Sequence, residues 1–307
     1  FISTYHQNQA LLMQSPAPAD QVCKESDISG ARAIIDSVLA EHRTILSSAE
    51  TRAIMNAFGV PITPAIEVSS ANQAMVAAES MGFPVSLKIN SPNLTHKSDV
   101  GGVKLNLTTV QEVRSEYTKM VERIQQEQPE ATIQGVTVEP MFKRPHVREL
   151  LIGVMRDPVF GPAITFGSGG TSVEVLKDNA IALPPLNQFL ATKMITQTKV
   201  STMLKAFRGL PEVNFDAIVD VLLRISDMVA QLPEIVELDI NPLFADEEGV
   251  MAVDARISVK ALPVNHKPYQ HMAIHPYPSE LIHSLETHSG LIVELRPIRP
   301  EDAELEL

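Results

Sequence analysis

The sequence LKINSPNLTHKSDVGGVKLNL, residues 87–107, contains the end of one alternating apolar run and the whole of another. The runs at 84–90 and 102–107 predict two β-strands joined by a polar loop. Lys88 lies in the first strand among valine, leucine and isoleucine, where an unpaired ammonium group would be costly to bury. As an isolated feature it favours a lysine at a sheet edge whose amine reaches solvent; the alternative is a cation that binds a phosphate.

The loop after this strand favours the phosphate alternative. It places four polar side chains ahead of a glycine pair: His96, Lys97, Ser98, Asp99, Gly101 and Gly102. Backbone N–H groups of such loops can close around phosphate oxygens, although a glycine pair alone is a weak signal.

Helices and strands alternate on both sides of this hairpin. The sequence predicts helices at 29–42, 47–59, 70–82, 109–128, 186–197, 200–207 and 215–231, and strands at 65–69, 133–142, 148–156, 162–167, 235–244 and 250–259. Ser47 and Glu50 have the spacing of a capping box at the start of the second helix. This mixture of hairpins and crossovers predicts an α+β or α/β fold of two lobes.

Two glutamates flank the connection between the strands at 133–142 and 148–156. Glu139 comes near the end of the first strand and Glu149 at the start of the second. Carboxylates at facing strand ends could accept hydrogen bonds from an adenine amino group and a ribose hydroxyl. Without further context, the pattern favours two solvated acids instead.

The segment ELDINP, residues 237–242, carries oxygen-bearing side chains at alternate positions. Glu237, Asp239 and Asn241 therefore share one face of the predicted strand, and Asp254 follows in the next strand. Mg²⁺ binds a few such oxygens together with substrate phosphates and water. A solvent-facing row of polar residues fits the alternation at least as well.

Three other features carry weaker signals. The glycine-rich loop at 167–170 either approaches a ligand closely or turns a hairpin, and its spacing does not separate the two. His271 and His275 lie in a proline-broken segment, which argues against a zinc site. Cys23 has no recognisable neighbouring base and is expected to be an inert thiol.

Charge and hydropathy exclude several classes of protein. The chain has 307 residues and a formal net charge of −12, without the clustered cationic surface that nucleic-acid binding requires. No apolar stretch reaches the roughly 18 residues of a membrane span. A single cysteine fits a reducing compartment, so we expect a cytoplasmic protein that binds neither nucleic acid nor membrane.

Taken together, these segments resemble a known family. LKINSPNLTHKSDVGGVKLNL, VTVEPMFKRPHVRELLIGVMRDPVFGPAITFGSGGTSVEVLKD, ELDINPLF and VDARISVK are similar, in this order, to the ATP-grasp β subunit or domain of ADP-forming acetyl-CoA synthetases, relatives of the succinyl-CoA synthetase β subunit. The resemblance implies a two-lobed ATP-grasp domain over residues 23–262, with ATP or ADP and Mg²⁺ as cofactors.

The resemblance also implies a role for each candidate residue. The nucleotide phosphates would be contacted by Lys88 and by the loop residues His96, Lys97 and Ser98. Glu139 would lie beside the adenine and Glu149 near the ribose. The Mg²⁺ ligands would be Asn241 and Asp254, with Asp239 next to them. His96 would be catalytic, because in this branch of the family the equivalent histidine can carry a phosphoryl group between the nucleotide and a phosphohistidine of the CoA-ligase part.

The two ends of the chain resemble parts of further domains. Residues 1–22 look like the end of a CoA-ligase domain, 263–290 like a linker, and 291–307 like the truncated start of a GNAT acetyltransferase domain. This order is similar to that of bacterial protein lysine acetyltransferases that modify acetyl-CoA synthetase. It implies that the chain's partners are the CoA-ligase and GNAT domains of one polypeptide and a protein substrate such as an acyl-CoA synthetase, with CoA or acetyl-CoA bound only by the missing domains.

Three hypotheses follow for the function. The first is a regulatory nucleotide-binding domain of such an acetyltransferase. The second is a working ADP-forming acyl-CoA ligase that uses His96 as a phosphoryl relay. The third is a structural spacer, and it predicts that the chain has no affinity for nucleotides.

Overall fold

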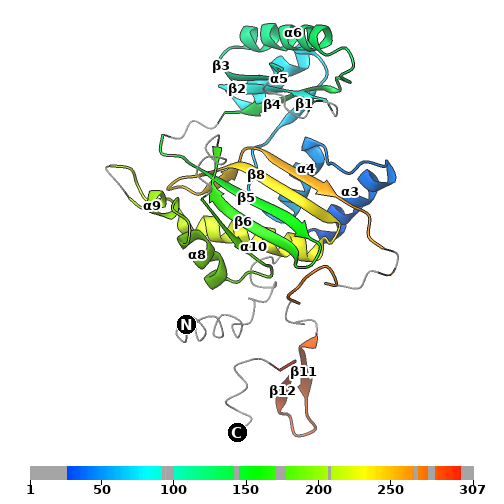
Figure 1. The fold of residues 1–307 in the computed structure, drawn as a ribbon, viewed down its shortest axis with the longest axis vertical. Helices are drawn as coiled ribbons and strands as arrows, with labels where there is room; N and C mark the ends of the chain where they lie inside the picture. Colours follow the sequence, from blue (N-terminus) through cyan, green and yellow to red (C-terminus); the bar gives the residue numbers. More distant parts are fainter. Residues whose placement is uncertain are drawn as a thin grey trace. The chain divides into compact units, whose positions relative to one another are not determined.

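The computed structural model describes residues 26–91, 94, 100–141, 145–170, 178–206, 209–263, 265, 269–275 and 281–298 (Figure 1). These residues divide into two compact units. Unit 1 takes its residues from Phe1–Leu46, Ala53–Pro61 and His146–Leu307, and unit 2 from Ser47–Arg52 and Ile62–Pro145. The mixed α/β architecture with two units agrees with the fold expected from the sequence.

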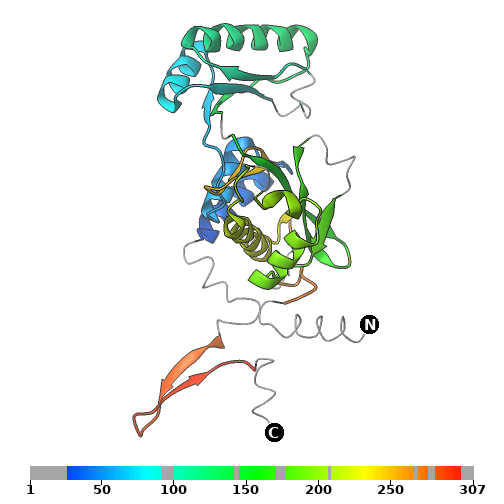
Figure 2. The ribbon, with the colours of Figure 1, turned by 90° about the vertical axis from the view of Figure 1, so that its left-hand side faces the viewer.

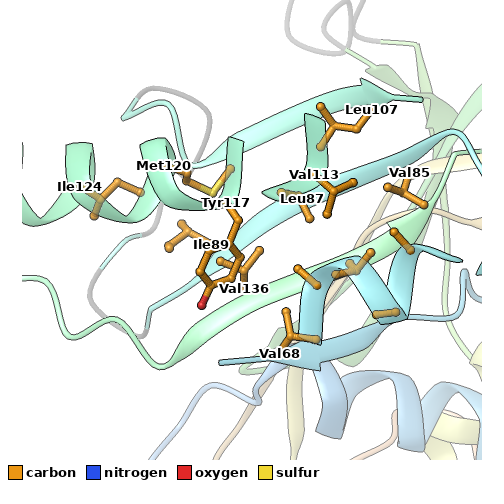
Figure 3. Close-up of a cluster of buried hydrophobic side chains, with 14 residues drawn as sticks. Val68, Val85, Leu87, Ile89, Leu107, Val113, Tyr117, Met120, Ile124 and Val136 are labelled. Carbon is orange, nitrogen blue, oxygen red and sulfur yellow. The ribbon is translucent and has the colours of Figure 1, made fainter. Parts of the chain in front are cut away.

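Unit 2 is a four-stranded antiparallel sheet covered by two helices. The strand order is β1 (Ile66–Val68), β4 (Gly135–Pro140), β2 (Val85–Asn90), β3 (Val103–Leu107). The helices α5 (Ala71–Met81) and α6 (Val110–Glu127) pack on one face of this sheet, where alternate strand residues meet the apolar sides of the helices (Figure 3). The core of unit 2 is therefore a single layer between sheet and helices.

Local sequence signals explain where these two helices and the helix at Ser48–Ala57 begin. Thr109 and Glu112 form a reciprocal capping box at α6, and Ser70 caps α5. At helix α4 (Ser48–Ala57), the Ser47 N–H donates to the Glu50 carboxylate at 2.7 Å, and the Glu50 N–H donates to the Ser47 hydroxyl at 3.3 Å. The predicted capping box is thus confirmed, and it fixes the first turn of α4.

Unit 1 is built on a larger antiparallel sheet. Its order is β10 (Ala255–Val259), β8 (Ile235–Ala245), β5 (Arg148–Asp157), β6 (Gly161–Ser168), β7 (Asn179–Ala182), and β9 (Val250–Ala252) pairs with the far end of β8. The helices are α3 (Ile28–Ala40), α8 (Gln188–Thr196), α9 (Ser201–Leu204) and α10 (Phe215–Gln231). Helices α8 and α10 lie against one face of the sheet (Figures 1 and 2), and the other face carries exposed side chains such as Met155 and Ile181.

The strand predicted at 250–259 is interrupted. Two short strands, β9 and β10, replace it, and they keep one register on β8, with Ala252 opposite Leu243 and Ala255 opposite Ile240. The Val253 N–H donates to the Pro242 carbonyl, and the Asn241 N–H donates to the Asp254 carbonyl at 3.2 Å. This shared register places Asp254 beside Asn241.

The segment predicted as a linker, residues 263–290, contacts the rest of unit 1 and contributes a strand to a hairpin. The Nε2 of His271 lies 2.9 Å from the Val229 carbonyl of α10, and Met272 is buried. A hairpin follows, formed by β11 (His283–Glu286) and β12 (Ile292–Leu295). The domain boundary expected at residues 290 and 291 falls in the turn of this hairpin. No helix in the described ranges is both long enough and apolar enough to cross a bilayer.

Candidate functional site

The face of the unit 2 sheet opposite its helices is polar and partly buried. Strands β2 and β4 present alternate residues to each side, so Leu87 and Val138 enter the core. The residues on the polar face are Ser86, Lys88, Thr137 and Glu139, of which Ser86, Thr137 and Glu139 are buried. Polar groups buried in this way require partners, and the charged ones find them in one another.

Lys88 and Glu139 form an ion pair on this face. The Lys88 Nζ lies 2.7 Å from Oε2 of Glu139, whose side chain is 3% exposed, whereas that of Lys88 is 19% exposed. Strand β2 lies between β4 and β3, so Lys88 is on an inner strand. The alternative of a solvent-directed lysine at a sheet edge is therefore wrong, and the structure brings two of the candidate residues together.

Arg52 completes this cluster and was not identified from the sequence. Its Nη2 contacts Oε1 of Glu139, and its Nε donates to the Thr63 carbonyl at 3.1 Å. Arg52 comes from α4, 87 positions before Glu139 in the sequence. Both oxygens of Glu139 are thus bound to cations. An adenine amino group could donate to this carboxylate only through the lone pairs that Arg52 and Lys88 leave free.

The predicted phosphate loop lies largely outside the described residues. This holds for His96, Lys97, Ser98 and Asp99, whose roles stay predictions. At the start of the loop, the hydroxyl of Ser91 is buried and has no hydrogen-bond partner in the described part of the chain. At its far end, the Ile89 N–H donates to the Gly102 carbonyl at 2.8 Å.

In unit 1, the glycine-rich loop approaches the protein's own strands closely. The Gly169 N–H donates to the Glu149 carbonyl at 2.8 Å, and a Cβ on Gly169 would lie 2.4 Å from the Leu150 carbonyl oxygen. Gly170 has a φ of +75°, and a Cβ there would lie 2.1 Å from Oε2 of Glu149. Only glycine fits these two positions without displacement of neighbouring atoms, because no side chain has room.

Glu149 is exposed and lies next to this loop. The strand that carries it begins at the buried Arg148, whose guanidinium donates to the carbonyls of Met203 at 3.1 Å, Pro211 at 2.7 Å and His146. These bonds anchor the start of β5. They thereby fix the position of Glu149 relative to the glycine-rich loop.

Asn241 connects the same loop to the acidic strand β8. Its Oδ1 accepts a hydrogen bond from the Gly170 N–H at 3.0 Å. Along β8, Leu238 and Ile240 are buried while Glu237 and Asp239 point outward, as the alternation predicted. The exposure of these two acids fits the solvent-face interpretation, so the metal interpretation needs independent support.

Electrostatics at Asp239 supply some of that support. The Asp239 carboxyl is partly desolvated although the residue is exposed, and this desolvation raises its pKa above the ordinary value. The carboxylates of Asp254 and Glu237 raise the pKa further, against the opposing charge of Arg256. Carboxylates that repel one another in this way would be stabilised by a cation. Within the described ranges, no three His, Cys, Asp or Glu side chains are arranged as a metal site. Asp239, Asp254 and the amide of Asn241 do offer the oxygen donors that Mg²⁺ prefers.

Comparison with known proteins identifies the family. Residues 37–259 match the ATP-grasp domain family. The β subunit of acetate–CoA ligase (ADP-forming) I from Pyrococcus furiosus is 36% identical over 230 residues, which is 75% of this chain and 98% of that subunit. The acetate–CoA ligase (ADP-forming) I of Archaeoglobus fulgidus is 36% identical over 242 residues, 78% of this chain but only 35% of that longer protein.

Solved structures agree with this assignment. Acetyl-coenzyme A synthetase 1 of Ca. Korarchaeum cryptofilum, in complex with coenzyme A and Ca-AMPCP, has a TM-score of 0.71 and 38% identity, and the match covers 75% of this chain and 100% of that one. A complex of the same protein with coenzyme A and Mg-AMPPCP has a TM-score of 0.66 and 36% identity, with the same coverage of both chains. The chain therefore belongs to the ATP-grasp family of ADP-forming acetyl-CoA synthetase β subunits.

Proposed function

We propose that this chain is the nucleotide-binding part of an ADP-forming acyl-CoA ligase. The observation that carries the proposal is the Lys88 ammonium, held 2.7 Å from a buried carboxylate on an inner strand of unit 2. A cation fixed in this way is suited to contact a phosphate, because its position is set before the ligand arrives. The P. furiosus and A. fulgidus relatives are ADP-forming acetate–CoA ligases, which supports the same activity class.

The remaining candidate residues have roles that suit phosphoryl transfer. Bound Mg²⁺ would neutralise phosphate charge, and Asp239, Asn241 and Asp254 would hold it in unit 1. Glu149 would contact the ribose. His96 would accept the terminal phosphoryl group of ATP on an unprotonated ring nitrogen while the bond to the leaving ADP breaks, and then pass the group to a histidine of the CoA-ligase part. Lys97 and Ser98 would line the phosphates beside it.

This proposal differs from the first hypothesis drawn from the sequence. The relatives compared above are ligases, so they favour the working ligase over a regulatory domain of a protein lysine acetyltransferase. The GNAT domain, its protein substrate and the cytoplasmic location stay predictions. CoA is bound in the Korarchaeum complexes, and we propose that in this protein the CoA-ligase part binds it.

Transfer of labelled phosphate tests the relay. The full-length protein is incubated with γ-labelled ATP and Mg²⁺, and acid-labile, protein-bound label is measured. We expect label in the wild type and in His283→Ala, which changes an exposed histidine of β11. Loss of label in His96→Ala supports the relay. Equal labelling of His96→Ala, or no label in a wild type that binds ATP, would contradict it.

A further inference from the structure

The guanidinium group of Arg52 is held in place by two contacts within unit 2. It donates to the Thr63 backbone carbonyl at 3.1 Å and contacts Oε1 of the buried Glu139. The capping box at Ser47 and Glu50 fixes the helical turn that carries Arg52. The side chain is 15% exposed, so most of the guanidinium is withdrawn from solvent. Arg52 is therefore a preorganised cation of unit 2.

The charge of the cluster depends on Arg52. Lys88 and Glu139 alone sum to zero, because the ammonium is paired at 2.7 Å with a full carboxylate charge. An anionic ligand near such a neutral pair would gain little from long-range attraction. With Arg52 the three groups sum to +1. Since these groups lie in a partly dehydrated location, that net charge is weakly screened.

Glu139 has a second function in this arrangement. Without it, Arg52 and Lys88 would repel each other, and neither cation would have a fixed position. With it, each cation is held by one carboxylate oxygen, and the outward edge of Lys88 stays 19% exposed. The Glu139 carboxylate orders the two cations but neutralises one positive charge, and the positive charge of Arg52 offsets that loss.

We propose that Arg52 is a positioning residue of the nucleotide site. It acts on the ligand's phosphates through Glu139 and Lys88, and it does not touch the ligand itself. Its role is to offset the Glu139 charge, so that Lys88 is held in place and the cluster still attracts an anion. This inference rests on the proposed function, because it assumes that the ligand beside Lys88 is a nucleotide polyphosphate.

Calorimetry with MgATP on the complete 307-residue chain tests the inference. Arg52→Gln makes the cluster neutral, and we expect the dissociation constant to rise about tenfold or more, as when a charge near a buried ligand group is removed. The matched control is Arg114→Gln, which removes the same charge from an exposed position of α6. We expect that variant to bind MgATP as the wild type does.

A charge-restoring double variant separates this role from a structural one. Arg52→Gln with Glu139→Gln returns the cluster to +1 but leaves Lys88 without its carboxylate, so the affinity should recover in part, above that of Arg52→Gln, if charge is the cause. If Arg52 touched the ligand or only supported the fold, the second substitution would give no recovery. That result would overturn the proposal, as would equal affinities of Arg52→Gln and Arg114→Gln.

The variant Arg52→Lys and the wild-type affinity for MgATP separate a failure of this inference from a failure to fold and from a failure of the proposed function. If Arg52→Gln does not fold by circular dichroism, Arg52→Lys preserves the charge. Arg52→Lys does not keep both guanidinium contacts, so tighter MgATP binding by Arg52→Lys than by a folded Arg52→Met supports the proposal, and equal binding by the two variants contradicts it. A wild-type chain that binds no MgATP overturns both the proposed function and this inference, whereas a binding wild type with an unaffected Arg52→Gln overturns the inference alone.

Discussion

The backbone N–H of Gly170 donates a hydrogen bond to Oδ1 of Asn241 at 3.0 Å, across 71 positions of the sequence. This bond joins the glycine-rich loop to strand β8, which also carries Asp239. An amide oxygen has two lone pairs, so Asn241 can orient the loop and still offer one lone pair to a cation. The loop and the candidate metal ligands are therefore parts of one local structure in unit 1.

Substitution at Gly169 should destabilise this structure. In Gly169→Ala the new methyl group would lie 2.4 Å from the Leu150 carbonyl oxygen. Relief of this clash requires a shift of the backbone, which costs more free energy than the rotation of a side chain. We expect a loss of about 1–3 kcal/mol in the free energy of unfolding, measured with urea. Gly153→Ala is the control, because its new methyl group would have no neighbour closer than 3.9 Å. Equal stability of the two variants would contradict the close approach.

The Glu139 cluster makes a second prediction. Glu139→Gln leaves the two cations Arg52 and Lys88 without their shared carboxylate, and the loss of one member of a buried ion cluster costs about 3–5 kcal/mol. We expect a lower free energy of unfolding by roughly that amount, partly recovered in Glu139→Gln with Arg52→Met. Glu67→Gln, at an exposed position of β1, should leave stability unchanged. A Glu139→Gln variant as stable as Glu67→Gln would show that the cluster is not formed.

Sequence reasoning identified Lys88 and Glu139 but not the contact between them or the role of Arg52. Helix boundaries and strand alternation are local signals, so the capping box at Ser47 and the polar face of β8 could be predicted. The pairing of Arg52 with Glu139 joins residues 87 positions apart in the sequence, and no local periodicity encodes a contact between such distant positions.

Irregular features were missed for a related reason. The residues at 250–259 alternate like one strand and keep one register along β8, yet the regular strand is interrupted at Val253 and Asp254, where Val253 lies opposite Pro242, which has no N–H to donate. A short strand, β7, was not predicted either, since four residues carry too little pattern. The shared register bears on function because it places Asp254 next to Asn241.

The core of unit 2 allows a matched test of burial. Val113 on α6 is fully buried, whereas Val76 on α5 is 66% exposed. Val113→Ala should lower the free energy of unfolding by about 2 kcal/mol, from lost transfer free energy and a small cavity. Val76→Ala should change it little, because alanine also has a high helix propensity. Similar losses in both variants would contradict the packing of α6 on the sheet shown in Figure 3.

The raised pKa of Asp239 predicts that the free energy of unfolding falls as the pH rises through the titration of this group. Its pKa is raised in the folded protein, first by burial and then by the neighbouring carboxylates. Between the ordinary aspartate pKa and this raised value, the folded state binds more protons than the unfolded state, so this group's contribution falls as pH rises through that window. In EDTA, Asp239→Asn should therefore be more stable than the wild type at pH 7, and the difference should shrink as the pH falls from the raised pKa toward the ordinary aspartate pKa.

The control for Asp239 removes a carboxylate elsewhere in unit 1. Glu247→Gln, in the exposed turn after β8, should give the same melting temperature as the wild type at neutral pH. If Asp239→Asn is less stable than Glu247→Gln at pH 7 without metal, the carboxylate contributes a favourable contact and the repulsion described here is wrong.

Binding of MgATP to the wild-type chain and to Lys88→Met tests the central claim most directly. The matched control is Lys104→Met on the neighbouring strand β3, where the side chain is 38% exposed and pairs with Glu116. By titration calorimetry we expect the wild type and Lys104→Met to bind MgATP equally, and Lys88→Met to bind at least about tenfold more weakly. A folded wild type without affinity for MgATP, or a Lys88→Met variant that binds like Lys104→Met, would contradict the assignment of this site.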